Sequence, residues 1–268
     1  MNDIENMMIN SIIEKNKNNK KENDYYKDGL LYCGNCNTEK EFILPSGKKV
    51  PCLCECQAEK EKLDEEKEKL NTHIFYNKKY IDVDYQNVFF KDIENLNEYY
   101  KFANKFVDNF DEIKKTKTGL YIFGDTGNGK TYIASAIANE LLHKGYKVLM
   151  TKNNDAIKQL NETSTYFKSL ILEMDLIIID DFGANRETDF QLEQVYNLIN
   201  FLYSNKKVVI FTTNIPRIEL GNEQNITKKR IYDRVIEMTY GIYLKNAGMR
   251  KNIANEKRKI LEDLLKWK

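Results

Sequence analysis

The sequence predicts an α/β fold, a parallel sheet with helices on both faces, preceded by a small cysteine-rich module. Short apolar segments alternate with helical stretches through the second half of the chain, which is the pattern of a parallel sheet. A glycine-rich loop follows the first of these strands, and five cysteines lie between Cys33 and Cys56. The 268 residues are enough for one sizeable domain and one small appendage.

Residues 1–28 are rich in Asn and Lys, with apolar side chains at positions such as Ile4, Met8 and Ile12. The spacing predicts one short amphipathic helix followed by a polar tether. Two interpretations stay open for this helix: a frayed terminus, or a segment that binds a partner protein.

Residues 29–56 are predicted to form a zinc-binding module. A Cys-x-x-Cys turn precedes a predicted hairpin whose first strand is Glu41–Leu44, and a Cys-x-Cys-x-Cys run follows it. Both clusters can converge on one tetrahedral Zn²⁺, which resembles a zinc ribbon, although five thiols compete for four places. Cys52 is the expected spare thiol, His73 is a remote substitute ligand, and metal-free thiols are the alternative. The predicted ligands are Cys33, Cys36, Cys54 and Cys56.

Residues 57–86 are predicted to be a charged helical linker. Between Gln57 and Asn71, Glu and Lys recur three and four residues apart, which is typical of a solvated helix with weak ion pairs. The rest of the chain, residues 87–268, is predicted to be the main α/β domain. The aromatic side chains of residues 72–118 are expected to pack against the sheet.

The main domain is predicted from periodicity to contain four core strands and five helices. The strands are Gly119–Phe123, Lys147–Thr151, Leu176–Asp180 and Lys207–Thr213. The helices are Leu96–Phe110, Tyr132–His143, Asp155–Glu173, Leu192–Tyr203 and a terminal helix, Ile253–Trp267.

The glycine loop has the spacing G-x-x-x-x-G-K-[ST] and lies between a predicted strand and a predicted helix, which is the setting of a P-loop. Its glycines allow a tight turn that aims backbone N–H groups at a phosphate chain, next to a positive helix N-terminus. Lys130 is expected to reach the β- and γ-phosphates, and the Thr131 hydroxyl is expected to bind Mg²⁺. The predicted nucleotide-binding residues are Gly124, Asp125, Thr126, Gly127, Asn128, Gly129, Lys130 and Thr131.

Polar side chains follow two of the apolar strands, and they are predicted to complete the site. Asp180 and Asp181 end one strand, where a carboxylate can emerge from the buried sheet at the rim of the site. Asp180 is expected to hold Mg²⁺ and Asp181 to orient the attacking water. Asn214 follows the next strand and is expected to contact the γ-phosphate or to position that water.

The bulk properties exclude few functions. The net charge of +1 gives no global field for a polyanion, so any nucleic-acid surface has to be a local patch. The N-terminus lacks a basic segment before an apolar core, and no apolar run approaches the ~18 residues of a membrane span. A cytoplasmic protein without membrane contact is expected, and in that reducing compartment clustered cysteines favour a metal over disulfides.

Taken in order, the glycine loop, Leu-Ile-Ile-Ile-Asp-Asp-Phe-Gly, Phe-Thr-Thr-Asn and Lys-Arg-Ile-Tyr-Asp-Arg resemble the bacterial and phage replicative helicase loaders of the DnaC/DnaI-like AAA+ ATPase family. The resemblance covers about residues 87–250, and the cysteine module resembles the zinc-containing N-terminal regions of some members. It implies that Arg234 is the arginine finger and Arg250 the sensor 2 residue. The chain departs from many AAA+ proteins in having Asp181 where they have Glu.

The resemblance implies an enzyme that hydrolyses ATP with Mg²⁺ and loads a hexameric replicative DNA helicase onto single-stranded DNA at replication initiation, and that assembles into an oligomer on that helicase. Residues 1–70 are expected to bind the helicase and the ATPase domain the single strand. Cations and stacking groups after the second strand are the candidates for strand binding. They are Lys152, Lys158, Tyr166, Phe167 and Lys168.

Two other functions remain open. One is the ATPase helper of an insertion-sequence transposase, a relative within the same fold that typically lacks the cysteine module. The other is an adaptor that binds ATP as a conformational latch without hydrolysing it, which the short side chain of Asp181 favours.

Overall fold

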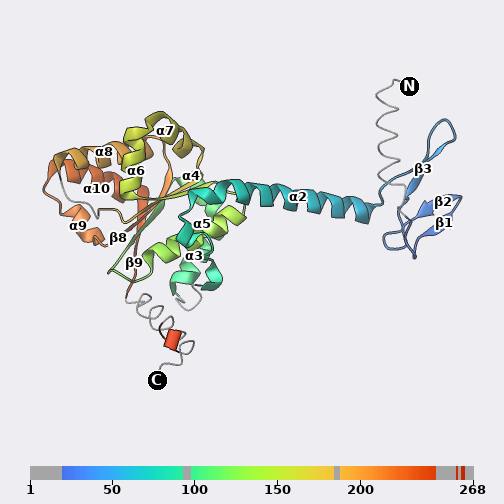
Figure 1. Cartoon of the computed structure of the whole chain (residues 1–268), viewed down its shortest axis with the longest axis horizontal. Helices are drawn as coiled ribbons and strands as arrows, with labels where there is room; N and C mark the ends of the chain where they lie inside the picture. The colour runs from blue at the N-terminus through green and yellow to red at the C-terminus, as the bar shows by residue number, and fades with distance from the viewer. Residues whose placement is uncertain (1–19, 93–97, 184–187, 246–257, 259–260, 263–268) are drawn as a thin grey trace. The chain divides into compact units, whose positions relative to one another are not determined.

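The computed structural model describes residues 20–92, 98–183, 188–245, 258 and 261–262 (Figure 1). The chain divides into two compact units, Met1–Thr72 and His73–Lys268. The finer predicted division at residues 28, 56 and 86 stays a prediction. The predicted N-terminal helix, Arg250 and most of the predicted terminal helix lie outside the described residues.

The first unit is built from two short antiparallel hairpins. The pair β1 (Tyr25–Lys27) and β2 (Leu30–Tyr32) precedes the pair β3 (Glu41–Ile43) and β4 (Lys49–Pro51). The second pair is the predicted hairpin, with Gly47 at φ 81° in its turn, a conformation that glycine adopts without cost. The first pair was not predicted, because segments of three residues are too short to show a periodicity.

A buried ion pair joins the segments of this unit. The Lys40 ammonium lies 2.6 Å from the Asp24 carboxylate, and the two side chains are 0% and 2% exposed. The same carboxylate accepts hydrogen bonds from the backbone N–H groups of Lys21 and Gly34. Burial alone would raise the pKa of Asp24, but the hydrogen bonds, led by that from Lys40, lower it to about 2.

Helix α2 (Glu55–Asn77) begins inside the second cysteine cluster and is longer than the predicted Gln57–Asn71. None of its side chains is buried, as expected for a helix of alternating Glu and Lys. The salt bridge between Lys67 and Asp64 is exposed on both sides and contributes little.

The second unit contains a five-stranded parallel sheet in the order β6-β7-β8-β5-β9. Its carboxyl edge carries the ends of β5, β7 and β8, the three strands that precede the predicted site residues. Parallel strands bring these ends together at one edge, which is where open α/β sheets bind ligands. The strands are β5 (Gly119–Phe123), β6 (Val148–Lys152), β7 (Leu176–Asp180), β8 (Val208–Thr213) and β9 (Thr239–Tyr243).

Helices cover both faces of the sheet, as predicted (Figure 1). Alternate residues of each strand point to opposite faces, so Ile178 packs with the helices of one face and Ile177 and Ile179 with those of the other. One face carries α3 (Glu98–Asp108), α4 (Phe110–Thr116) and α5 (Lys130–His143). The other carries α6 (Asn153–Glu162), α7 (Ser164–Glu173), α8 (Asp189–Ser204) and α10 (Ile226–Met238).

Short helices complete this unit. Before α3 lie three turns of 3₁₀-helix, and α9 follows β8. They are η1 (Lys78–Tyr80), η2 (Val83–Tyr85), η3 (Phe90–Asp92) and α9 (Arg217–Gly221).

One predicted helix of this unit was wrong. The single helix over 155–173 is two helices, because Thr163 leaves the helical conformation at φ −131° and ψ 44°. The predicted helix Leu96–Phe110 is confirmed as α3 in its described part, and α4, which begins after Asn109, was not predicted. Strand β9 was missed: its central Gly241 and its partly exposed side chains hide the apolar alternation that marks an inner strand.

Candidate functional site

The glycine loop runs from the end of β5 into α5, as the sequence predicts. Gly127 and Gly129 have φ angles of 88° and 85°, so both occupy the left-handed region that other residues avoid. Gly129 is the residue before α5, and it offers no side chain to cap the first turn. The backbone N–H groups of that turn therefore remain able to bind an anion.

The Lys130 ammonium lies at the centre of the site and is only 6% exposed. It donates hydrogen bonds to the carbonyl oxygens of Gly124 and Asp125, both at 2.9 Å. It also donates to Oδ1 of Asn214 at 2.7 Å. The structure thus joins the glycine loop to the end of β8, which the sequence predicted to share one site.

Asp180 lies next to the first turn of α5. Its carboxylate accepts a hydrogen bond from the Thr131 hydroxyl at 2.9 Å and another from the Thr212 hydroxyl. Burial raises the pKa of Asp180, and the two hydroxyl hydrogen bonds partly oppose the shift. A hydroxyl and a carboxylate side by side are the oxygen ligands that Mg²⁺ takes at nucleotide sites.

Asp181 follows directly and has an unusual backbone. Its φ angle is 54°, and its side chain is exposed at the edge of the sheet. Its backbone N–H donates to the Thr212 hydroxyl at 3.1 Å, so Thr212 fixes both acidic residues. Thr212 was not predicted to have a role, although a hydroxyl at the end of the strand that precedes Asn214 could have indicated one.

A second connection ties the loop to the chain after β9. The Asn128 side-chain amide is buried and donates to the carbonyl oxygen of Leu244 at 2.9 Å. The backbone N–H of Leu244 in turn donates to Phe123 at the end of β5. A side chain at Gly124 would meet the Leu244 oxygen at 2.4 Å, so only glycine fits there.

Arg234 lies on α10, and its contacts in the described chain are with α8 and with its own helix. The guanidinium lies over the rings of Tyr196 and Tyr203, with 4.9 Å and 5.7 Å from its carbon to the ring centres. None of these contacts involves the glycine loop of the same chain. The predicted role of Arg234 in a neighbouring subunit stays a prediction.

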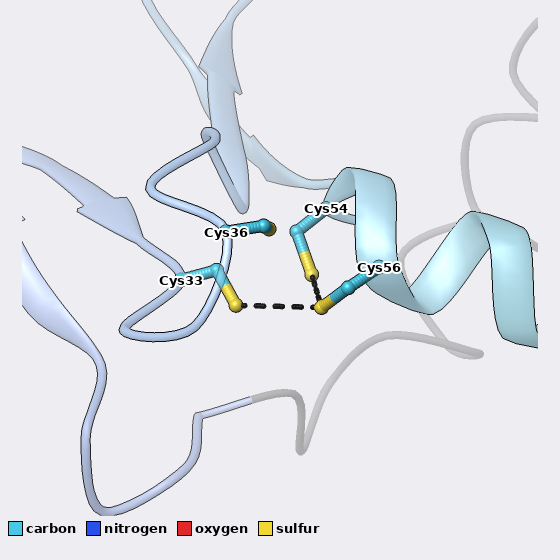
Figure 2. A group of neighbouring side chains, drawn as sticks. All are labelled: Cys33, Cys36, Cys54 and Cys56. Carbon is cyan, nitrogen blue, oxygen red and sulfur yellow. Dashed lines mark hydrogen bonds between the residues drawn. The ribbon is translucent and has the colours of Figure 1, made fainter.

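Four cysteines converge in the first unit (Figure 2). Cys33 and Cys36 come from the turn after β2, and Cys54 and Cys56 from the start of α2. The four sulfur atoms lie within 4.8 Å of one another, with 3.7 Å between Cys33 and Cys56 and 3.4 Å between Cys54 and Cys56. Tetrahedral zinc at about 2.3 Å from each thiolate spaces sulfurs by about 3.8 Å, so this set fits Zn²⁺.

The remaining cysteine and a threonine complete the surroundings of this cluster. The Cys52 thiol donates to the Glu39 carbonyl oxygen instead, and burial raises its pKa. Thr38 joins the two halves: its hydroxyl lies 3.0 Å from the Cys36 sulfur and accepts from the Glu55 N–H. The Thr38 hydrogen bond is the main reason that the pKa of Cys36 falls to about 6.

A hollow of about 710 Å³ opens along β6 and contains three of the residues predicted to bind a single strand. They are Lys152, Lys158 and Tyr166. Asp180 also lines the hollow, which therefore adjoins the predicted magnesium site. Lys79 and Tyr80, which were not predicted to bind a strand, line it from the segment before the sheet.

The other two predicted strand-binding residues do not line this hollow. Phe167 is 0% exposed and packs in the core, so its prediction as a stacking group was wrong. The Lys168 ammonium lies over the Phe201 ring, 5.8 Å from its centre.

Known proteins resemble this chain over both units. The family described as IstB-like ATP binding protein matches residues 82–257. The phage-like element PBSX protein XkdC of Bacillus subtilis (strain 168) is 24% identical over 237 residues, or 82% of this chain and 85% of that protein. The replicative helicase loader DnaI of the same organism is 24% identical over 271 residues, or 92% of this chain and 86% of that protein.

A solved structure shows the same fold. The crystal structure of DnaI superposes with a TM-score of 0.53 at 21% identity, covering 63% of this chain and 94% of that chain. Within the described residues, we find no helix that combines the length and the apolar character needed to span a membrane.

The family match covers well over half of the chain and includes the glycine loop, both strand-end acids and Asn214. The chain therefore belongs to the IstB-like ATP-binding protein family and is an ATPase of the AAA+ class.

Proposed function

We propose that this ATPase loads a hexameric replicative DNA helicase onto single-stranded DNA during the initiation of replication. One observation carries the proposal: the similarity to the replicative helicase loader DnaI covers 92% of the chain, so it includes the cysteine module as well as the ATPase domain. A protein that shared only the ATPase would match from about residue 82 onward, as the family match does.

In this proposal the residues around the glycine loop bind and hydrolyse ATP. Lys130 and the backbone N–H groups of the loop hold the phosphates, and Thr131 and Asp180 hold Mg²⁺. The ion neutralises charge that develops on the phosphates. Asp181 orients the attacking water, and Asn214 positions the γ-phosphate or that water.

Two arginines complete the predicted catalytic set. Arg234 reaches the γ-phosphate bound by a neighbouring copy of the chain, assembled on the helicase, and Arg250 contacts the nucleotide of its own chain. The contacts of Arg234 support this role, since no carboxylate in the described chain forms an ion pair with it.

The first unit is proposed to bind the helicase, with Zn²⁺ held by the four converging cysteines. Its exposed apolar side chains support a protein contact, because a bound partner would remove them from water. They include Tyr26, Phe42 and Ile43, which are 60%, 40% and 53% exposed.

Single-stranded DNA is proposed to bind along the hollow beside β6. Lys79, Lys152 and Lys158 supply cations for a phosphate backbone, and the exposed Tyr166 supplies a ring on which a base can stack. Asp180 also lines the hollow, so a strand bound there would lie next to the ATP site, which offers a route for ATP to change strand affinity.

Co-elution and helicase assays test the proposal. Full-length protein with ATP is expected to co-elute with the replicative helicase of its host and to stimulate unwinding of a primed circular single strand coated with single-strand binding protein. Lys130→Ala is the matched control for the need for ATP, and Lys152→Glu with Lys158→Glu is the control for the strand. Retained stimulation by both variants, or no co-elution with ATP, would reject the loader.

Two alternatives give different results in the same assays. A transposition helper would bind double-stranded DNA and a transposase but would ignore the helicase. A latch that binds ATP without hydrolysing it would co-elute with the helicase in ATP and show no turnover with or without it.

A further inference from the structure

Two tyrosines on α8 enclose the guanidinium of Arg234. Tyr196 and Tyr203 are seven residues apart and so lie on the same face of the helix, opposite α10. The guanidinium carbon lies 4.9 Å and 5.7 Å from their ring centres. Both distances fall within the roughly 6 Å range of a cation–π contact.

The hydrogen-bond donors of Arg234 are largely unused. Nη1 donates to the Arg230 carbonyl oxygen at 2.9 Å, and Nη2 makes a long contact of 3.4 Å with the Tyr196 hydroxyl. Nε is buried and has no hydrogen-bond partner among the residues that the structure describes. A guanidinium has five N–H donors, and a buried donor without a partner is unfavourable, so this arrangement favours an acceptor that arrives from elsewhere.

The acid one turn further along the same helix is engaged by another residue. Glu237 lies one turn beyond Arg234, where a salt bridge is normally available. Its carboxylate accepts from the Tyr203 hydroxyl at 2.9 Å, and that bond raises the pKa of Tyr203. Arg234 forms no ion pair with a carboxylate anywhere between residues 98 and 183 or 188 and 245.

We propose that Tyr196 and Tyr203 are positioning residues that hold Arg234 ready for the γ-phosphate bound by a second copy of the chain. The inference rests on the proposed role of Arg234 between subunits. An aromatic face attracts a cation without neutralising it, whereas a carboxylate would form a bidentate pair and compete with phosphate. Tyr203 adds a second function, because its hydroxyl keeps Glu237 occupied.

Mixing full-length variants separates this role from a structural one. Lys130→Ala protein cannot bind ATP but retains Arg234, and Arg234→Ala protein binds ATP but lacks the arginine. Together they are expected to recover ATPase activity through mixed interfaces. Tyr196→Leu or Tyr203→Leu is then added to one of the two proteins at a time.

The proposal predicts an asymmetric result. Either leucine on the Lys130→Ala chain, beside the working Arg234, should lower the recovered activity by about 2- to 30-fold, the range of one cation–π contact. The same leucine on the Arg234→Ala chain should leave the recovered ATPase activity unchanged. Tyr196→Phe should retain the recovered activity on either chain. ATP affinity and the midpoint of thermal unfolding of each single variant verify that the domain is intact.

Three results would overturn the proposal. Equal loss with the leucine on either chain would show that the rings only support the fold, and full recovery on both would show that they do not position Arg234. If the parent pair itself fails to recover activity, Arg234 is not shared between subunits and the inference fails with it. Co-elution with the helicase is measured separately, so the loader function can survive that outcome.

Discussion

At the scale of single residues, Lys130 and its three acceptors determine how the site responds to phosphate. The ammonium bonds two carbonyl oxygens of its own loop and the Asn214 side chain, so a phosphate has to displace some of these partners. Asn214 therefore affects both the position of the Lys130 ammonium and the binding of any γ-phosphate. Its substitution should change binding and turnover separately.

Asn214→Asp and Asn214→Ala are expected to act differently on ATP affinity. The carboxylate of the first would form a charge-assisted bond with Lys130 and repel phosphate, so we expect about tenfold weaker ATP binding or more. Asn214→Ala removes a neutral acceptor that competes with phosphate for Lys130. This variant should bind ATP within about threefold of the wild-type affinity and hydrolyse it more slowly. Titration of a fluorescent ATP analogue measures both, and equal affinities would contradict the role of the Lys130 contact.

Lys130→Ala and Asp181→Asn are expected to separate binding from hydrolysis. The first deletes the phosphate-facing cation and should abolish measurable ATP binding. The second should bind ATP normally and lower turnover by about 10²-fold or more, because the water loses its orienting carboxylate. Asn tolerates the left-handed backbone of Asp181 as well as Asp does, so the backbone is conserved. Wild-type turnover by Asp181→Asn would show that another group orients the water.

At the scale of elements, the Asp24–Lys40 pair holds the segments of the cysteine module together. Asp24→Asn leaves a covered ammonium without its carboxylate, which should destabilise the module by about 3 kcal/mol, the lower end for buried pairs. Zinc transfer to a colorimetric chelator should be correspondingly faster than in the wild type. Asp64→Asn, in an exposed pair of the same unit, is the matched control and should have no effect.

The acid dependence of this pair follows from the pKa of Asp24. Its value of about 2 in the folded chain lies below the ordinary 3.8. The stabilisation by the pair is therefore complete above about pH 4 and is lost as the pH falls towards 2. If the wild-type module unfolds as readily as that of Asp24→Asn at neutral pH, the Asp24–Lys40 pair does not stabilise it.

Elements with strong local signals could be predicted, and those that depend on tertiary contacts could not. Strands β5 and β7 match their predicted bounds, because apolar runs buried on both faces are unambiguous beside a glycine loop. The break at Thr163 is a local change of backbone conformation that the apolar periodicity of the sequence does not reveal. Strand β9 is defined by pairing with β5 across a long separation in sequence.

The same distinction applies to the site. Lys130, Thr131, Asp180 and Asn214 were predicted to meet because parallel strands end together, and their hydrogen bonds join them in the structure. Contacts between distant segments were missed: the bond from Asn128 to Leu244, and the packing of Arg234 on Tyr196. In each of these two contacts, the residue types alone do not indicate which residue the partner is.

At the scale of the whole molecule, the cysteine module and the ATPase domain belong to separate compact units, and metal content tests the proposed zinc site of the first. Protein purified without chelator should hold about one equivalent of zinc, and Cys33→Ser or Cys36→Ser should lose it. Cys52→Ser should retain it, because that thiol lies outside the cluster. Zinc near zero in folded wild-type protein, or its loss in Cys52→Ser alone, would overturn the assignment of the ligands.

The bond from Asn128 to the Leu244 carbonyl has a thermodynamic consequence for the whole chain. The phosphate-binding loop and the backbone leaving β9 share a hydrogen bond in the protein interior, so neither can shift without a cost to the other. Linkage makes this coupling reciprocal: if ATP displaces the end of β9, then any partner that grips the chain beyond Leu244 changes the affinity for ATP by the same factor. Any partner bound there would act as an effector of nucleotide binding without touching the nucleotide.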